Sequence, residues 1–327
     1  MAVQIISTRA ASVDEWSQAF ARCERATFFH GPRWSEVWEI HSHGRYRPRP
    51  QLVQFSDGQT AVLTITTERV GPCVERDHLS PAGTYGGWLT PSPLGPDHAR
   101  LLSAEILRRP SVVWRRGPAD LSDGVTSHGA TSEATHVIDL RAGVGAARAR
   151  WEGAARRQAR KAERNGVRVR PGDVPGDWDL YFDLYLAAIR RWGTATAVYP
   201  QSLFTALSRV GPTAKLFLAE SSGRVVAGAV LLLAHRHAGY WQGASGGAVA
   251  GASNLLHWEI LDRLCSEGFK TYDLNPSGGL PGVIRFKESL GAVPMAAPIV
   301  IKPHPFEKVA RRVERWRQRL GRWRPDA

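Results

Sequence analysis

The residues best suited to chemistry lie near the end of the chain, in the segment GLPGVIRFKESLGA, Gly279–Ala292. Arg285, Phe286 and Lys287 follow one another there, with glycines on both sides. A fixed ammonium can stabilise charge that develops in a reaction, and a guanidinium can bind a phosphate or carboxylate through two hydrogen bonds. The alternative is a short helix with Phe286 in the core and Lys287 in solvent.

A second candidate is Asp273, which ends the apparent strand KTYDL and precedes Asn275. Functional residues are often found where a strand meets a loop. A carboxylate at this position could accept a proton from an attacking amine or orient it. It could equally cap the loop by bonding the following backbone. Trp241 could line a pocket for the amine, or belong to the core.

Two further patterns are weaker. GASGG, at 243–247, matches the G-x-S-x-G pattern of hydrolases, but several small residues follow where a helix should begin at once. HRH, at 235–237, would place two imidazoles on one face of a strand without an obvious third ligand. We therefore expect neither a hydrolase nor a metal site.

The charge of the chain indicates an anionic partner. The 327 residues include 43 Lys and Arg against 30 Asp and Glu, for a net charge of +13. Such a surface attracts nucleic acid, phosphorylated metabolites or anionic lipid. No apolar run approaches the roughly 18 residues of a membrane span. The absence of a signal pattern, and three separated cysteines without a CxxC pair, predict a cytoplasmic protein without a disulfide framework.

Basic residues concentrate in two segments. Arg156 and Arg160 are four residues apart in an Ala-rich and Arg-rich stretch, so they share one helix face, with Lys161 beside it. The tail, 304–327, has apolar residues at helical spacing with arginines between them. This pattern predicts a basic amphipathic helix. It would either dock on the body of the protein or contact nucleic acid or a membrane surface.

The order of elements repeats. Each half of the chain reads as a strand, two helices, a set of antiparallel strands, a helix and another strand, which is the layout of the GNAT acyltransferase fold. We therefore predict an α/β fold with mixed sheets and two tandem GNAT-like domains, at 1–130 and 131–303, followed by the basic helix. The elements on which the division depends include a strand at 61–70, one helix at 146–164, helices at 177–192 and 253–268, and a last strand at 297–302.

Several segments, in this order, resemble the Fem-type, or FemAB-like, transferases of the GNAT superfamily. They are SPAGTYGGWL in the first half, then RRQARKAERNGV, YWQGAS, NLLHWEILDRLCSEGFKTYDL and IRFKESLGA in the second. The resemblance covers nearly the whole chain. It implies transfer of an amino acid from aminoacyl-tRNA to an amine of a peptidoglycan precursor or small molecule, with no other cofactor.

The resemblance also implies roles for residues. Phe286 and Lys287 would lie at the 3′ end of the donor, and Tyr85 and Gly86 beside the acceptor groove. With this donor, Lys287 and Asp273 become the catalytic candidates and Arg285 a donor contact. Arg156, Arg160 and Lys161 would contact the tRNA backbone, while Trp241 and Asn275 would belong to the acceptor side.

Two alternatives remain open. The stretch QGASGGAVAGAS, at 242–253, lacks the basic residue that opens the CoA pyrophosphate loop of ordinary GNAT enzymes. Backbone N–H groups at a helix N-terminus can nevertheless bind phosphate, so an acyl-CoA donor is the first alternative. The second is a non-catalytic protein that binds nucleic acid or a membrane surface.

Overall fold

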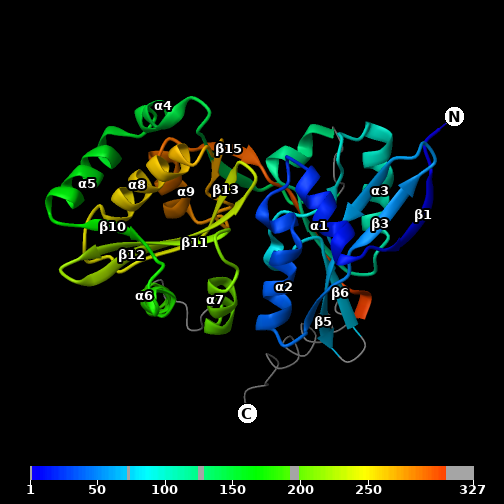
Figure 1. Ribbon diagram of the computed structural model, residues 1–327, viewed down its shortest axis with the longest axis horizontal. Coiled ribbons are helices and arrows are strands. Elements are labelled where there is room, and N and C mark those ends of the chain that lie inside the picture. The colour runs from blue at the N-terminus through cyan, green and yellow to red at the C-terminus, as the bar shows by residue number, and fades with distance from the viewer. Residues whose placement is uncertain (1, 72–73, 124–128, 192–198, 307–327) are drawn as a thin grey trace, which may run out of the picture.

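Two halves lie side by side in the computed structural model, which describes residues 2–71, 74–123, 129–191 and 199–306 (Figure 1). The C-terminal half is built on one mixed sheet, and the N-terminal half on two smaller sheets. A shared apolar cluster joins the halves, because Trp34 and Trp38 of the first pack with Phe204 and Trp241 of the second. The predicted mixed α/β fold with two halves is confirmed.

The seven-stranded sheet of the C-terminal half has the order β10-β11-β12-β13-β14-β9-β15. Its strands are β9 (Ala134–Asp139), β10 (Arg168–Pro171), β11 (Ala214–Ser221), β12 (Arg224–Ala234), β13 (His237–Ser245), β14 (Thr271–Asp273) and β15 (Val293–Ala296). The helices are α4 (Gly143–Ala149), α5 (Gly153–Arg164), α6 (Asp177–Arg191), α7 (Gln201–Ser208), α8 (Ala252–Ser266) and α9 (Pro281–Ser289). Helices α4, α5, α8 and α9 cover one face, and α6 and α7 the other (Figure 1).

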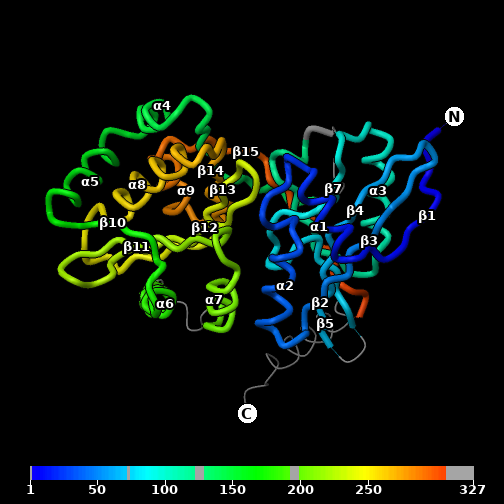
Figure 2. The backbone as a smooth tube through the Cα atoms, viewed as in Figure 1, coloured from blue at the N-terminus to red at the C-terminus, as the bar shows by residue number. Residues whose placement is uncertain are grey.

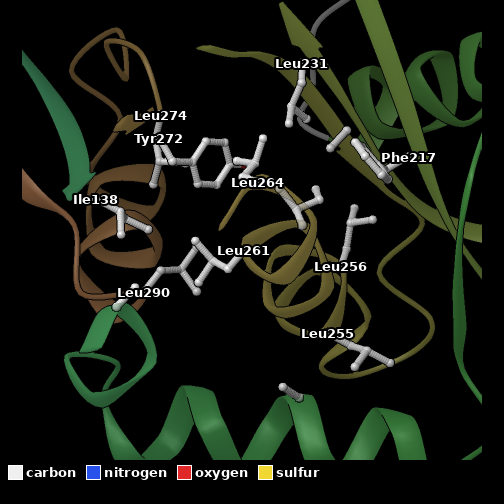
Figure 3. Packing of buried hydrophobic residues seen from close by; sticks show 14 of the residues in the cluster. Ile138, Phe217, Leu231, Leu255, Leu256, Leu261, Leu264, Tyr272, Leu274 and Leu290 are labelled. Atoms are coloured by element: carbon white, nitrogen blue, oxygen red, sulfur yellow. The ribbon is translucent and has the colours of Figure 1, made fainter. Parts of the chain in front are cut away.

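The side chains of β14 point alternately to the two faces of the seven-stranded sheet. Tyr272 and Leu274 point into the core beneath α8, where Leu261 and Leu264 meet them (Figure 3). Because successive side chains of a strand point to opposite faces, Asp273 points the other way, toward the N-terminal half. Strands β13 and β14 are parallel and pair only over His237–Gly239 and Thr271–Asp273. Beyond that point β13 continues to Ser245. The segment that follows β14 instead turns away from β13 at Asn275, whose φ is 57°.

The N-terminal half has sheets in the orders β1-β3-β4-β7 and β16-β8-β6-β5-β2. The strands are β1 (Ile5–Ala10), β2 (Tyr46–Pro48), β3 (Gln51–Phe55), β4 (Thr60–Leu63), β5 (Thr66–Gly71), β6 (Val74–His78), β7 (Trp88–Leu89), β8 (Val112–Arg115) and β16 (Ile299–Lys302). The α-helices are α1 (Val13–Arg22), α2 (Pro32–His41) and α3 (Pro96–Leu107), and short 3-10 turns lie at Phe28–His30, Pro81–Gly83 and Pro118–Asp123.

The prediction of one strand at 61–70 is wrong, because β4 and β5 belong to different sheets. The break falls at Thr64, whose hydroxyl donates to the Leu79 carbonyl at 2.7 Å and accepts from the Gly87 N–H at 3.3 Å. A side chain that bonds backbone in this way offers the chain an alternative to the ladder. Apolar alternation on its own did not reveal the break.

The single helix predicted at 146–164 is also wrong. Helices α4 and α5 are separated at Trp151, which is buried and packs edge-on against Trp258 with ring centroids 5.2 Å apart. The Glu152 N–H then donates to the Ser289 carbonyl at 2.9 Å. Burial of the indole and this bond to the end of α9 interrupt a segment whose composition favours a continuous helix.

The last predicted strand forms, but in the other half. β16 pairs with β8, so the chain returns from the C-terminal half to the N-terminal sheet, as the tube in Figure 2 lets the reader follow. β15, which composition did not predict, takes the edge of the seven-stranded sheet instead, and its four residues, VPMA, are all exposed. Residues 307–327, which include most of the expected basic helix, lie outside the described residues. The domain limits at 130 and 303 stay a prediction.

Candidate active site

The turn that follows β14 joins the predicted catalytic residues. Asp273 is 1% exposed, and one of its oxygens accepts from the Asn275 N–H at 2.8 Å and from the Thr135 hydroxyl. The other oxygen lies 3.5 Å from Nε2 of His237. Burial by itself would raise the pKa of Asp273, but the hydrogen bonds from His237, Thr135 and Asn275 outweigh burial and lower that pKa. The carboxyl is therefore held in its charged form.

Lys287 is buried on the opposite side of this turn. Helix α9 begins with Pro281 at its first turn, a position where the missing N–H costs nothing, and it carries Lys287 inward at 3% exposure. The ammonium donates to the carbonyl of Asn275 at 2.6 Å. Burial lowers the pKa of Lys287 to about 8, although the negative charge of Asp273 opposes the change. The alternative of a solvated Lys287 is wrong.

An aromatic and imidazole cluster surrounds the lysine. Nδ1 of His257 shares a hydrogen bond with the Tyr272 hydroxyl at 2.9 Å, and the imidazole packs edge-on against Phe286, with ring centroids 5.5 Å apart. Burial, and then the charge of Lys287, lower the pKa of His257 to about 3, so this imidazole is neutral. Phe286 is partly buried against the core of the C-terminal half. Lys287 thus stands as a cation in largely apolar surroundings.

A cavity of about 570 Å³ lies between the two halves, on the face of the sheet to which Asp273 points. Its floor comes from β9, β13, β14 and β15, and its roof from loops of the N-terminal half. Arg25, Arg141, Arg150 and Lys270 contribute positive charge to its lining. This volume is sufficient for a small organic molecule.

Tyr85 lines the cavity on the side of the N-terminal half. It is 1% exposed and lines the cavity, and burial and then the nearby charge of Asp273 raise its pKa well above the usual range. The hydroxyl is close to Asp273 and Thr135 but makes no hydrogen bond of regular geometry. Gly86 lies against backbone instead, since a Cβ there would overlap the carbonyl of Leu79.

The other predicted site residues lie further away. Trp241 is 9% exposed and packs against Trp34 at 5.7 Å between ring centroids, within the core that joins the halves. Arg285 is on the surface and pairs with Glu152 at 3.2 Å. Helix α5 buries Ala155, Ala159 and Ala162, and its basic residues, Arg156, Arg160 and Lys161, occupy the more exposed side. The fold thus brings together Asp273, Asn275, Lys287 and Tyr85.

Thr135, His237 and His257 are parts of the site that sequence reasoning missed. The sequence placed His237 on one strand face together with His235. That pairing is wrong, because His235 lies in the turn before β13, with φ of 50°. No local sequence signal pairs His237 with Asp273, because only the register of β13 and β14 in the structure places them on the same face. No group of three His, Cys, Asp or Glu side chains suited to a metal ion occurs within the described residues.

The structure also bears on the hydrolase pattern and on membrane insertion. β13 ends at Ser245 and α8 begins at Ala252, so the helix that a nucleophile elbow requires does not follow the serine. Within the described part of the chain, no helix has the length and apolar character needed to cross a bilayer.

Comparison with known proteins identifies the fold. Residues 149–288 match the acetyltransferase (GNAT) domain family. The whole chain is similar in structure to FemX, with 14% sequence identity, a TM-score of 0.66 and coverage of 93% of this chain and 99% of that one. Residues 149–288 are thus similar to a GNAT domain, and the chain as a whole has the fold of FemX.

Two other solved structures are also similar to this chain. One is the C-terminal domain of a putative lysylphosphatidylglycerol synthetase from Agrobacterium fabrum, with 13% identity, a TM-score of 0.54 and coverage of 89% and 93% of the two chains. The other is L-PGS from Bacillus licheniformis, with 12% identity, a TM-score of 0.50 and coverage of 83% and 91%. No curated protein sequence matches the chain.

Proposed function

We propose that this protein is an aminoacyltransferase that moves an amino acid from aminoacyl-tRNA to an amine and forms an amide. The observation that carries the proposal is the buried Lys287, which is 3% exposed and bonded to the turn beside Asp273. The GNAT domain supports acyl transfer, and the fold shared with FemX and with a putative lysylphosphatidylglycerol synthetase supports the aminoacyl donor.

In this proposal the donor approaches from the α9 side. An aminoacyl ester is already activated, so positioning supplies much of the rate. Lys287 would lie near the 3′ end of the tRNA and stabilise the negative charge that develops on the leaving ribose oxygen. Phe286, which is partly exposed beside Lys287, would stack on the terminal base or exclude water. Arg285 would meet a phosphate once its pair with Glu152 opens.

The acceptor would occupy the cavity. Its lining combines three carboxylates, of Asp120, Asp139 and Asp273, with four basic side chains, a setting for a small amine that also bears an anionic group. Tyr85 and Asp273 would contact the amine, and Asn275 would hold the two sides of the site in register through its bonds to Asp273 and Lys287. The amine belongs to a small molecule or to a peptidoglycan precursor.

The tRNA backbone would follow α5. The basic side of this helix, with Arg160 and Lys161 exposed, presents charges that bind phosphates without reading sequence. Each phosphate that is neutralised steepens the decrease of affinity with salt.

The experiment is transfer of radiolabelled amino acids, carried on a full set of charged tRNAs, to a panel of amines that includes amino acids, amino sugars and lysine-containing peptides. We expect an amide product that requires both the protein and intact tRNA. Product that still forms after the charged tRNA has been digested with RNase would rule out this donor.

Acyl-CoA is the second candidate donor, and one contact favours it. The Gly-rich loop before α8 lacks a basic residue of its own, but Arg191 at the end of α6 lies against it, with Nη1 2.8 Å from the position of a Cβ on Gly247. A guanidinium at this place could bind a pyrophosphate beside the N-terminus of α8. Micromolar binding of CoA in calorimetry, without binding of tRNA, would favour this candidate.

A further inference from the structure

The floor of the cavity contains a row of side chains that runs from Asp273 to the edge of the sheet. Asp273 of β14 is directly opposite Val137 of β9, which is directly opposite Val293 of β15. Directly opposite residues of an antiparallel pair point to the same face, and all three line the cavity. The proposed function, on which this inference rests, uses only the charged end of this row.

The outer end of the row is apolar and open. Val293 and Met295 both line the cavity and are 53% and 42% exposed. Met295 belongs to the same face, because Thr135, directly opposite it, donates its hydroxyl to Asp273. Apolar surface of this kind is removed from water when an apolar group covers it, and this favours binding. The outer end of the cavity is therefore suited to an apolar part of a substrate.

A polar row lies next to the first one along the strands. Thr271, two residues before Asp273, is directly opposite Asp139. Since a strand rises about 3.3 Å per residue, this row is about 7 Å from the row of Asp273. Both residues line the cavity, so its floor extends from Asp273 in a second direction, along the strands rather than across them.

Three cations lie at the Asp139 end of the cavity. Arg141 pairs with Asp139 at 2.7 Å, and Lys270 immediately precedes β14. The backbone of Arg150 lies against Gly291, just before β15, and its charge also acts on Asp139. Lys270 and Arg150 both line the cavity, and neither forms an ion pair with another residue that the structure describes. Because Arg141 balances Asp139, this end has two positive charges without a matching anion.

The remaining charged residues of the cavity belong to its roof. Arg25 donates to the Trp88 carbonyl at 3.3 Å. Asp120 accepts from the Gly117 N–H at 2.9 Å and lies 3.6 Å from Nε2 of His30. Both charged side chains therefore have partners within the N-terminal half, and the cations that remain for a substrate are those of the floor.

We propose that the acceptor is a free amino acid with an apolar side chain. Its ammonium group meets the carboxylate of Asp273, and its carboxylate binds Lys270 and Arg150, whose long side chains span the distance between the two rows. Its side chain covers Val293 and Met295. The three contacts lie in different directions from Asp273, as the amine, carboxylate and side chain do around an α-carbon.

The product of this transfer is a dipeptide. The amine nitrogen forms a bond to the carbonyl carbon of the donor ester, and the C–O bond to the ribose breaks. The ribose oxygen keeps the electron pair of that bond and gains a proton, while the amine loses one. The atoms therefore balance with a peptide bond and a free ribose hydroxyl as the products.

The experiment is calorimetry on the full chain without any donor. The probes are leucine, phenylalanine, leucinamide, which lacks the carboxylate, and glycine, which lacks the apolar side chain. We expect leucine or phenylalanine to bind about tenfold or more tightly than leucinamide, the effect of losing a charge-assisted hydrogen bond. Glycine should also bind about tenfold or more weakly, because it leaves the apolar end uncovered.

Variants assign each contact to its residues. Lys270→Gln and Arg150→Gln should each weaken binding of leucine severalfold and leave binding of leucinamide unchanged. Arg209→Gln is their control, because Arg209 is an exposed cation at the end of α7 and does not line the cavity. Met295→Ser should weaken binding of leucine but not of glycine. Its control is Ile301→Ser, since Ile301 is 63% exposed on β16 and also lies outside the cavity lining.

All of these substitutions are at exposed positions, and thermal unfolding confirms that each variant is folded. Equal affinities for leucine and leucinamide, or no binding of leucine and phenylalanine at millimolar concentration, would overturn the proposal. Transfer from aminoacyl-tRNA to leucinamide but not to leucine would also overturn it and would leave the proposed function in place. Leucine binding that depends on Lys270, combined with failed transfer from aminoacyl-tRNA, would instead remove the donor and keep the acceptor site.

Discussion

The buried charged groups on the two faces of the seven-stranded sheet have opposite surroundings. On the α9 face, Lys287 is buried near the neutral His257 and the partly buried Phe286, and burial lowers its pKa to about 8. On the cavity face, Asp273 is an anion surrounded by donors, and its pKa is lowered in spite of burial. Asn275 bonds to both residues. A cation without a close carboxylate partner is available to a substrate charge, whereas a satisfied anion is suited to hold other groups in place.

The largest expected effect comes from removing the cation. Lys287→Met should lower transfer from aminoacyl-tRNA by about 10²–10³-fold, the usual loss when one preorganised stabilising group is removed. Lys215→Met is the control, because Lys215 pairs with Glu267 at 2.7 Å, at the C-terminal end of α8. A Lys287→Met protein that is folded and retains the wild-type rate would contradict a role on the donor face and favour a non-catalytic binding protein.

The same substitution tests whether burial of the charged Lys287 ammonium destabilises the folded protein. Its pKa is lowered from 10.5 to about 8 in the folded protein, so between these pH values the unfolded chain binds more protons. Wild-type stability should therefore rise across this window, by up to about 3 kcal/mol, as the penalty for the buried charge is relieved. Urea unfolding of Lys287→Met should lack this rise. Parallel pH profiles for the two proteins would mean that Lys287 is hydrated.

A smaller effect is expected on the cavity face, from the backbone that supports Tyr85. Gly86→Ala should destabilise the protein by about 1–3 kcal/mol, because the added Cβ overlaps the Leu79 carbonyl. Gly87→Ala is the matched control, since a Cβ there would meet the Trp114 Nε1 at an ordinary 3.6 Å. It should change stability by less than about 0.5 kcal/mol. Equal unfolding midpoints for the two variants would argue that Gly86 does not fix the backbone beside Tyr85.

Sequence reasoning found the elements that bear strong local patterns. The order of helices and strands, and a cation next to Phe286, follow from apolar spacing and from linked segments. It could not find the break at Thr64, where one hydroxyl redirects the chain, or the return of β16 to the first half. Nor could it pair His237 with Asp273, residues 36 positions apart, because that requires the register of two parallel strands. Local pattern carries no such information.

The most direct test of the two-sided site is a crystal structure with a non-hydrolysable aminoacyl-adenosine, in which an amide replaces the 3′ ester. The account predicts the adenosine beside Phe286 and Lys287 on the α9 face, with the aminoacyl group reaching toward Asp273. An adenosine bound in the cavity between the halves, with Lys287 still bonded only to Asn275, would contradict the assignment of donor and acceptor to opposite faces.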